Sequence, residues 1–249
     1  MEKIIKVGGF DTFYREEGSG KNLLLLHGWG GNNKSFTPVF NSLKNYFHVY
    51  CPDLWGFGDS AAPSAGADTY WYADMVMEFA ARAGIRKAHI IGHSFGGRIA
   101  VLLAAEYPEF VGKLVLCDAA GIRPKFSPAK RLAVARYRRL KRKVAAGRAD
   151  ASALAEWGSD DYRAADGVMR GVFVRVVNDF LEKEARKITA ETLLVWGKKD
   201  DATPLYMAKK YNKLIHSSGL VIVNDAGHFS YLDDFYLFDK TVRSFFGVL

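Results

Sequence analysis

A serine lies at the centre of the pentapeptide Gly92-His93-Ser94-Phe95-Gly96, with a glycine two residues away on either side. An apolar run at 88–91 precedes it and a helical pattern at 97–105 follows it, which predicts a tight turn from a strand into a helix. A serine on such a turn takes a strained backbone conformation that exposes its hydroxyl at the sheet edge, and the glycines relieve the crowding. The pattern predicts Ser94 as a nucleophile. The alternative is a glycine-rich turn whose serine only caps the helix.

A serine nucleophile is weak at neutral pH and needs a general base. His228 follows the last apolar run, in the loop 224–229, and comes after the serine in the chain, as the order serine, acid, histidine requires. We therefore predict His228 as the base. The other histidines begin a strand, end a strand, neighbour the serine or lie in a polar segment: His48 and His89, His27, His93, and His216, respectively.

The base in turn needs an acid that orients it, and two aspartates qualify. Asp200 follows the apolar run 193–196, and Asp118 follows the run 114–116. Both therefore fall at the carboxyl ends of predicted strands, and their positions alone do not separate them. We favour Asp200 and keep Asp118 as the alternative.

The oxyanion of a tetrahedral intermediate needs two backbone N–H donors. Phe95 directly follows the serine, at the start of a helix whose dipole favours negative charge, so its amide is one predicted donor. The second is expected from the glycine-rich loop 27–31, where we predict the amide of Trp29. The alternative is that this loop is an ordinary glycine-rich turn.

The elements that would position these residues follow from the spacing of the apolar runs. Six runs are predicted as strands buried on both faces, and the helical patterns between them imply a parallel sheet covered by helices. Residues 4–7 and 12–14 are predicted as a hairpin that adds antiparallel strands at one edge. The six runs are 23–26, 49–51, 89–91, 114–116, 193–195 and 220–223.

The alternation of strands and helices stops between about residues 122 and 187, here called the cap segment. Three helices are predicted in it, at 128–147, at 150–157 and from Ser159 to about Phe180. A helical excursion of this kind is predicted to lie as a lid over the carboxyl edge of the sheet, where ligands bind. The side chains predicted to contribute to a substrate pocket are aromatic: Tyr137, Trp157, Tyr162, Phe173 and, after the histidine, Phe229.

The positive charge of the chain is concentrated in one segment. The net charge is +8, and residues 122–148 hold eleven Lys and Arg and no acid, whereas the rest of the chain has 24 basic and 27 acidic residues. Such a run can bind nucleic acid or a membrane. Because no nucleic-acid-binding motif accompanies it, we favour a solvated helix face.

Length and composition set the remaining expectations. A chain of 249 residues suits one large α/β domain that carries an insertion. The first six residues lack the apolar run of a signal peptide, and no apolar stretch is long enough to span a membrane. Cys51 and Cys117 each end an apolar run and resemble small buried residues. We therefore expect a soluble cytoplasmic protein without a cofactor, a metal or a nucleic-acid partner.

The sequence resembles the α/β-hydrolase superfamily over essentially its whole length, through five motifs in the expected order. The matches are the oxyanion loop H-G-x-G at 27–30, the structural stretch D-x-x-G-x-G-x-S at 53–60, the nucleophile elbow at Ser94, the acid motif G-x-x-D at Asp200 and the histidine loop at 227–228.

The resemblance implies a mostly parallel sheet of about eight strands flanked by helices. It implies a core at 1–121 and 188–249, with a helical cap inserted at 122–187. It also implies a Ser94–Asp200–His228 triad and raises Asp200 over Asp118, although some members place the acid at the second position.

The activities of the family narrow the expected function. Epoxide hydrolases and dehalogenases use an aspartate nucleophile, so Ser94 argues against both, and a basic lid suits long-chain lipase action poorly. We expect a hydrolase of a small carboxylic ester that works through an acyl-serine intermediate. The alternatives are a C–C bond hydrolase of the meta-cleavage type and a small-ligand receptor that keeps the triad without turnover. An enzyme whose basic lid attracts anionic esters is a further variant.

Overall fold

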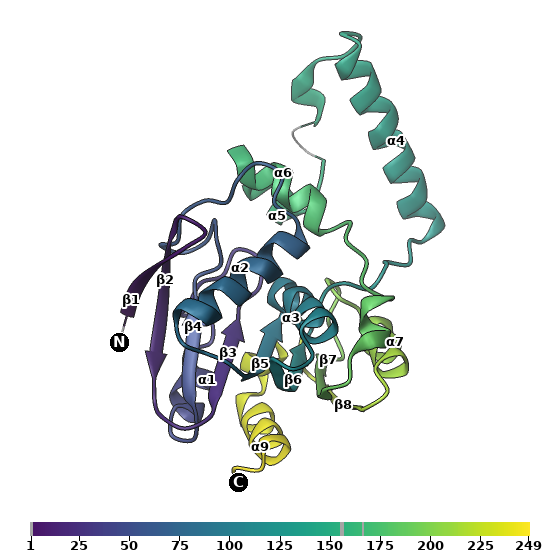
Figure 1. Ribbon diagram of the computed structural model, residues 1–249. Coiled ribbons are helices and arrows are strands. Elements are labelled where there is room, and N and C mark those ends of the chain that lie inside the picture. The colour runs from purple at the N-terminus through teal and green to yellow at the C-terminus, as the bar shows by residue number, and fades with distance from the viewer. Residues whose placement is uncertain (1, 155–156, 166) are drawn as a thin grey trace.

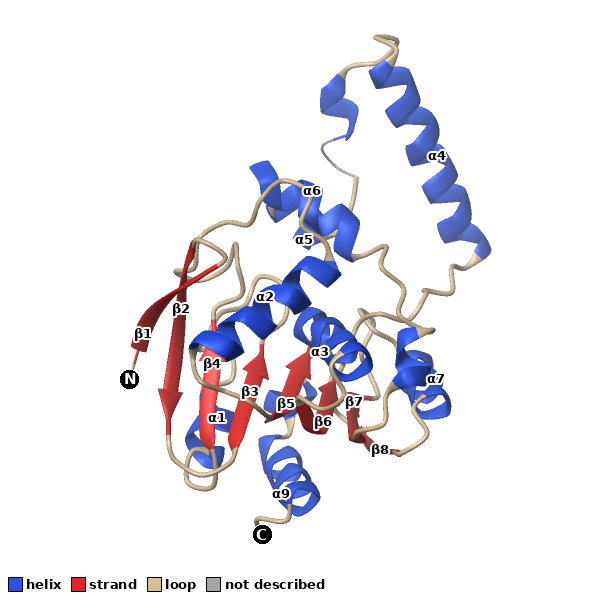
Figure 2. Ribbon diagram, viewed as in Figure 1, coloured by secondary structure: helices blue, strands red, loops and turns tan. Residues whose placement is uncertain are grey.

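The structure, a computed structural model, describes residues 2–154, 157–165 and 167–249. Figures 1 and 2 show a sheet with helices on both faces and a helical segment above one end of it. The elements in chain order are β1 (Glu2–Val7), β2 (Phe10–Glu17), β3 (Asn22–Leu26), α1 (Thr37–Leu43), β4 (His48–Pro52), α2 (Thr69–Arg82), β5 (Ala88–His93), α3 (Ser94–Glu106), β6 (Val111–Cys117), α4 (Pro128–Ala145), η1 (Ala151–Leu154), α5 (Asp160–Ala164), α6 (Gly167–Val176), η2 (Glu184–Lys187), β7 (Glu191–Gly197), α7 (Tyr206–Leu214), β8 (Ser218–Val223), α8 (Ser230–Asp233) and α9 (Phe235–Phe246).

The eight strands form one sheet in the order β1-β2-β4-β3-β5-β6-β7-β8. The pairings from β4 through β8 are parallel, whereas β1 pairs with β2, and β2 with β4, in antiparallel fashion. The predicted parallel sheet and its antiparallel hairpin at one edge are therefore confirmed. Because the inner strands run parallel, their carboxyl ends meet at one edge, where β5, β6 and β7 end side by side.

The two faces of the sheet are covered by different helices, with α2, α3 and α7 on one face and α1 and α9 on the other (Figure 2). Side chains alternate between these faces along each strand. In β3, Leu24 and Leu26 join the apolar cluster under α2 and α3, whereas Leu23 and Leu25 join the cluster under α1 and α9. All four are fully buried, which explains why the inner strands are continuous apolar runs.

The last strand departs from the prediction of burial on both faces. In β8 only Val223 is buried, and Ile222 is 36% exposed. The strand lies at the end of the sheet and pairs with β7 alone, so its outer side has no neighbouring strand. An apolar run by itself does not distinguish such an edge strand from an inner one.

The helices of the cap segment differ in part from the predicted ones. The first begins at Pro128 as predicted and ends at Ala145, two residues before Gly147, which takes a φ of +65°. The second is a single 3-10 turn, η1, and residues 155–156 of the predicted helix lie outside the described residues. The third is divided into α5 and α6. Ala165 leaves the helical conformation with a ψ of 134°, and Gly167 has a φ of +44°, while residue 166 is not described.

The two halves of the cap segment lie differently relative to the sheet. Helices α5 and α6 lie above the carboxyl edge, whereas α4 projects away from the body of the molecule (Figure 1). The segment leaves and rejoins the core at neighbouring points, because the amide of Leu181 donates a hydrogen bond to the carbonyl of Gly121 over 2.8 Å. Among the described residues, no helix combines the length and the apolar composition needed to cross a membrane.

Candidate active site

Ser94 lies at the turn where β5 ends and α3 begins, and its φ of +50° is one of two positive values at non-glycine residues in the described chain. The neighbouring glycines are required by space. A Cβ on Gly96 would lie 2.0 Å from the carbonyl oxygen of Leu26, and one on Gly92 would lie 2.6 Å from the carbonyl oxygen of Gly96. The tight turn is therefore possible only with glycine at both positions.

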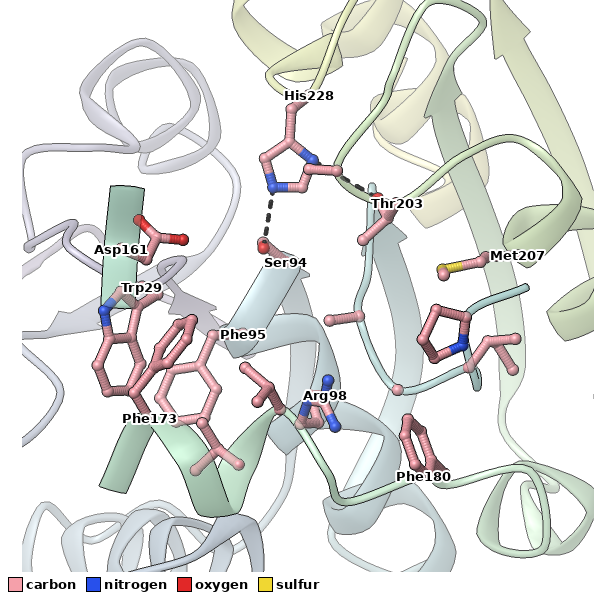
Figure 3. Close-up of a pocket in the computed structure, with 17 residues that line it drawn as sticks. Trp29, Ser94, Phe95, Arg98, Asp161, Phe173, Phe180, Thr203, Met207 and His228 are labelled. Carbon is pink, nitrogen blue, oxygen red and sulfur yellow. Dashed lines mark hydrogen bonds between the residues drawn. The ribbon is translucent and has the colours of Figure 1, made fainter. Parts of the chain in front are cut away.

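The ring of His228 joins the serine to an aspartate. Its Nε2 lies 2.9 Å from Ser94 Oγ, and its Nδ1 lies 2.9 Å from Asp200 Oδ2; Figure 3 shows the contact with Ser94. His93 holds the histidine loop from behind, because its Nε2 donates to the carbonyl of His228 over 2.7 Å. Burial lowers the pKa of His93 to about 3, so its ring stays neutral and acts as a fixed donor.

Four hydrogen bonds fix the carboxylate of Asp200. Its Oδ1 accepts the backbone amides of Ala202 and Thr203, both at 2.9 Å, and its Oδ2 accepts the Thr203 hydroxyl at 2.6 Å as well as His228. Burial alone would raise the pKa of this carboxyl, but the hydrogen bonds from His228 and Thr203 outweigh burial and leave the pKa below its usual value. The carboxylate is therefore ionised and fixed in direction.

The same contacts act on His228. Burial would lower the pKa of its ring, but the hydrogen bond and charge of Asp200, with weaker contributions from Asp118 and Asp161, raise the pKa above 6.5. Raising the pKa makes the ring a stronger proton acceptor while it is neutral.

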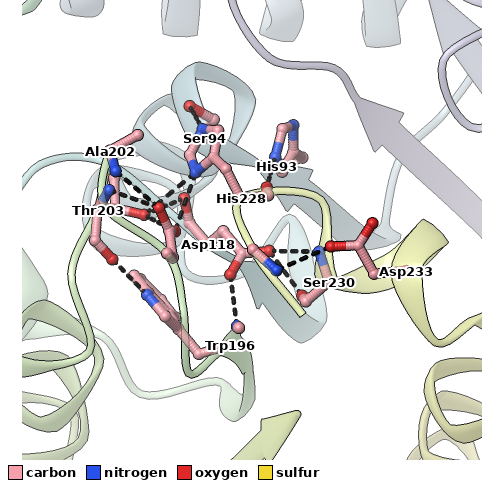
Figure 4. A network of polar contacts seen from close by, with 12 residues as sticks. His93, Ser94, Asp118, Trp196, Ala202, Thr203, His228, Ser230 and Asp233 are labelled. Carbon is pink, nitrogen blue, oxygen red and sulfur yellow. Dashed lines mark hydrogen bonds and ion pairs between the residues drawn. The ribbon is translucent and has the colours of Figure 1, made fainter. Parts of the chain in front are cut away.

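Asp118, the alternative acid, makes no hydrogen bond to the His228 ring. Its φ of +45° turns the carboxylate so that Oδ1 accepts the amide of Gly197 at 2.8 Å, and Oδ2 accepts the amide and hydroxyl of Ser230 at 3.0 and 2.6 Å (Figure 4). Burial raises the pKa of this carboxyl to about 7 despite these donors. Asp118 therefore joins the ends of β6 and β7 to the loop that carries His228.

The glycine-rich loop after β3 passes directly against the serine turn. A Cβ on Gly28 would lie 2.8 Å from His93 Nδ1 and 3.3 Å from Ser94 Cβ. His27 braces this loop, because its Nδ1 lies 2.8 Å from the carbonyl of Gly28 and its Nε2 accepts the amide of Leu54. Burial lowers the pKa of His27 to about 4, which suits this arrangement of one donor and one acceptor.

The two predicted oxyanion donors lie on these adjoining backbones. Trp29 follows Gly28, and Phe95 follows Ser94 at the first turn of α3, where backbone amides lack intrahelical partners. The Trp29 and Phe95 rings are in edge contact, with centroids 5.5 Å apart. The structure thus brings the two residues together beside Ser94.

A cavity of about 280 Å³ opens over Ser94. Trp29, Phe95 and His228 line it from the core, and Phe173 of α6 lines it from the cap segment (Figure 3). Its walls are mostly apolar, with few polar groups near the serine, which is how small-molecule sites are usually built.

The other predicted aromatic residues lie elsewhere. Tyr137, Trp157 and Tyr162 line a second cavity of about 530 Å³ between α4 and α6, which shares Phe173 with the first. Phe229 lines neither cavity; it is 49% exposed, and its ring lies against His93 with centroids 5.1 Å apart.

Two charged residues that line the first cavity were not predicted. Arg98 is only 6% exposed and donates to the carbonyl of Asp179, just beyond α6. It lies four residues after Ser94, so helical spacing alone could have placed it on the same side of α3. Asp161 of α5 faces His228 from the cap segment, and no sequence pattern indicates that position.

Known proteins resemble this chain in sequence and in fold. Residues 23–236 match the alpha/beta hydrolase family. Lipase 1 of Psychrobacter immobilis is 30% identical over 261 aligned positions, which cover 92% of this chain and 78% of that protein.

Two solved structures illustrate the likeness of fold. A membrane phospholipase A, described as a bacterial virulence factor, is 28% identical with a TM-score of 0.76 over 100% of this chain and 86% of its own. The meta-cleavage product hydrolase of Pseudomonas fluorescens IP01 has the same TM-score at 23% identity, over 98% and 97% of the two chains. At that identity the second likeness concerns the fold alone.

Proposed function

This chain belongs to the α/β hydrolase family, and on that premise we propose that it cleaves a small carboxylic ester through an acyl-serine intermediate. The observation that carries the proposal is the unbroken hydrogen-bonded series from Ser94 Oγ through the His228 ring to Asp200. A nucleophile, a base and an acid that orients the base are the parts that acyl transfer to serine requires.

In the first step, Ser94 Oγ attacks the ester carbonyl carbon while His228 Nε2 takes the hydroxyl proton. Asp200 accepts the Nδ1–H of the ring, which keeps Nε2 free to receive that proton and stabilises the imidazolium that forms. The imidazolium then gives the proton to the alkoxy oxygen, and the alcohol leaves. The products of this step are an alcohol and the acyl-serine.

The negative oxygen of the tetrahedral intermediate is assigned to the amides of Trp29 and Phe95. The close passage of the loop at Gly28 against Ser94 supports this assignment, because it sets both backbones beside the reacting carbon. Backbone amides fixed in this way stabilise the transition state without reorganising.

In the second step, a water molecule replaces the alcohol. His228 takes a proton from the water, the resulting hydroxide attacks the acyl carbon, and the proton returns to Ser94 Oγ as the carboxylic acid is released. The neutral ring of His228 is the active form. We therefore expect turnover to decrease at pH values below the raised pKa of this ring.

The cap segment is assigned the role of a lid that selects the substrate. Phe173 lines both cavities, so Tyr137, Trp157 and Tyr162 would contact a substrate group that extends beyond the first one. The cavity of about 280 Å³ over Ser94 would hold the ester group and the acyl carbons next to it.

The test is a panel of esters that vary in acyl length and charge, run beside a meta-cleavage-type C–C substrate. We expect turnover of short esters and labelling of Ser94 by a fluorophosphonate. Ser94→Ala should remove both, with turnover falling by roughly a million-fold. Faster cleavage of the C–C substrate would favour that reaction instead. Tight ligand binding without turnover would favour a receptor, and labelling of another serine would overturn the assignment of the nucleophile.

A further inference from the structure

The basic residues of the cap segment are concentrated on α4 and lack acidic partners. Eight of its 18 residues are Lys or Arg, and none is acidic. Among the described side chains, no ion pair joins a residue of α4 to a carboxylate. Within the part of the chain that the structure describes, the positive charge of this helix therefore has no ion-pair partner.

The helix is also accessible. It projects from the body of the molecule (Figure 2), and no described side chain along it is buried. Leu132 is 53% exposed, and Phe126, just before the helix, is 39% exposed. Apolar and basic side chains thus share an outer surface that a partner can reach.

One face of α4 is built around arginines. Arg131, Arg138 and Arg142 are spaced by seven and four residues, which places them on one side of the helix. With Phe126 they line a shallow hollow of about 330 Å³. Guanidinium groups bind phosphate oxygens through paired donors, so this face suits phosphate groups.

The opposite face of α4 is apolar and leads toward the nucleophile. Tyr137 and Trp157 lie with ring centroids 5.6 Å apart and line the cavity of about 530 Å³ behind the helix. That cavity shares Phe173 and Val177 with the cavity over Ser94. The two cavities therefore adjoin across these two side chains, between the basic helix and the serine.

We propose that α4 docks on an anionic lipid surface, where its arginines bind the phosphate headgroups and the cavity behind it receives the acyl chain of a lipid ester. Basic helices that also carry apolar side chains bind anionic membranes in this way. Docking stands on the charge and exposure of α4 alone, whereas entry of an acyl chain rests on the proposed ester hydrolysis.

The surface favours lipid over nucleic acid as the partner. Single-stranded nucleic acid is held largely by bases stacked on exposed aromatic rings. The aromatic ring of α4, on Tyr137, is instead turned toward Trp157, and the arginine face offers Phe126 as its aromatic side chain. The apolar cavity behind the helix also matches a hydrocarbon chain better than a nucleotide.

The first test measures sedimentation of the protein with vesicles. We expect binding to vesicles of phosphatidylcholine mixed with phosphatidylglycerol, weak binding to phosphatidylcholine alone, and loss of binding as salt is added. Ser94→Ala should bind as the parent does, which separates docking from catalysis. Absence of binding, or equal binding to both kinds of vesicle, overturns the proposal.

The second test changes the arginine face. In the triple variant Arg131→Gln, Arg138→Gln, Arg142→Gln, binding should weaken by roughly a hundred-fold, since each basic residue near an anionic surface contributes roughly fivefold. The matched control removes the same charge from exposed residues outside the cap segment and should bind nearly as the parent does. Its substitutions are Arg86→Gln, Lys213→Gln and Lys240→Gln. Circular dichroism checks that both variants fold. Equal weakening in both variants overturns the proposal, because it shows attraction by net charge alone.

Two further measurements sharpen the outcome. A single-stranded RNA oligomer serves as competitor, and binding of RNA as tightly as of anionic vesicles would replace lipid with nucleic acid as the partner. The parent should also cleave an ester embedded in anionic vesicles faster than the same ester in neutral ones. If vesicles bind but neither ester is cleaved, docking holds and the proposed hydrolysis fails.

Discussion

The carboxyl edge of the sheet and the cap segment are built in opposite ways. At the edge, each predicted reacting group is fixed by several contacts at once. Ser94 lies between glycines that admit no Cβ, Asp200 accepts four hydrogen bonds, and the carbonyl of His228 is held by His93. These groups therefore have little freedom to move independently.

Helices α4 to α6 of the cap segment bury far less, whereas its ends at Ile122, Leu181 and Ala185 are buried in the core. No described side chain of α4 or α5 is buried, and α6 buries only Val172 and Val176. Its helices contribute walls to the cavities, but few buried polar contacts fix their positions. Local stability of such segments is low, because little apolar surface is removed from water.

The two regions should therefore differ in the substitutions that they tolerate. The acyl transfer proposed above would need its groups within a fraction of an ångström of the productive geometry, and the buried hydrogen bonds at the edge would supply that precision. The cap segment can accept substitutions that reshape the cavities without disturbing those bonds.

After loss of the nucleophile itself, the largest effect on turnover should come from the choice of acid at the edge. Asp200→Asn should lower turnover by roughly ten-thousand-fold, because the amide reverses the donor pattern and favours the wrong tautomer of His228. Asp118→Asn should cost far less turnover while lowering the free energy of unfolding by about 1–3 kcal/mol through its lost hydrogen bonds. Steady-state kinetics and urea denaturation separate the two. The reverse ranking in turnover would move the acid to Asp118.

A pair of glycines tests the difference in packing directly. Gly96→Ala should lower the free energy of unfolding by about 3 kcal/mol, because the new Cβ would meet the Leu26 carbonyl at 2.0 Å. Gly171→Ala, in the middle of α6, has nothing within 4 Å of the new Cβ and should stabilise the helix by up to about 1 kcal/mol. Urea midpoints at unchanged slope measure both. Similar changes in the free energy of unfolding for the two variants would show that the core and the cap segment do not differ in packing.

The smallest expected effect concerns the charge of Asp161 in the cap segment and its influence on the pKa of His228 at the edge. Asp161 of the cap segment helps to raise the pKa of His228, so Asp161→Asn should lower that pKa and shift the acidic limb of kcat/KM toward lower pH by a few tenths of a unit. Asp160→Asn is the control, because that side chain is 94% exposed and pairs with Arg163. An equal shift in both variants would mean that α5 does not lie over His228 in solution.

Much of the edge could be predicted from sequence because its constraints are local. The order of apolar run, glycine, serine, glycine and helix indicates a strained turn at Ser94, and the position after the last apolar run indicates where His228 lies. The alternation of buried leucines in β3 likewise follows from the strand period. Motifs that act over a few residues are visible in the chain itself.

The remaining features depend on directions that sequence spacing does not encode. Asp118 and Asp200 both follow strand ends, but the Asp118 carboxylate, at a residue with positive φ, accepts hydrogen bonds from Gly197 and Ser230 instead of from His228. The helix predicted at 128–147 is present as α4, but its Tyr137 ring meets Trp157 of the same segment instead of the sheet. The break between α5 and α6 follows from backbone angles at Ala165 and Gly167.

The hydrogen bond between Leu181 and Gly121 also bears on how such a molecule diversifies. The chain leaves the core and returns to it at two residues that are joined by a backbone hydrogen bond. A gene segment coding for the residues between them could therefore be exchanged as a unit. If the cap segment selects the substrate as proposed, recombination at these two points would replace that selectivity in a single event. The proposed reacting groups would be inherited unchanged, since Ser94, Asp200 and His228 all lie outside the exchanged segment.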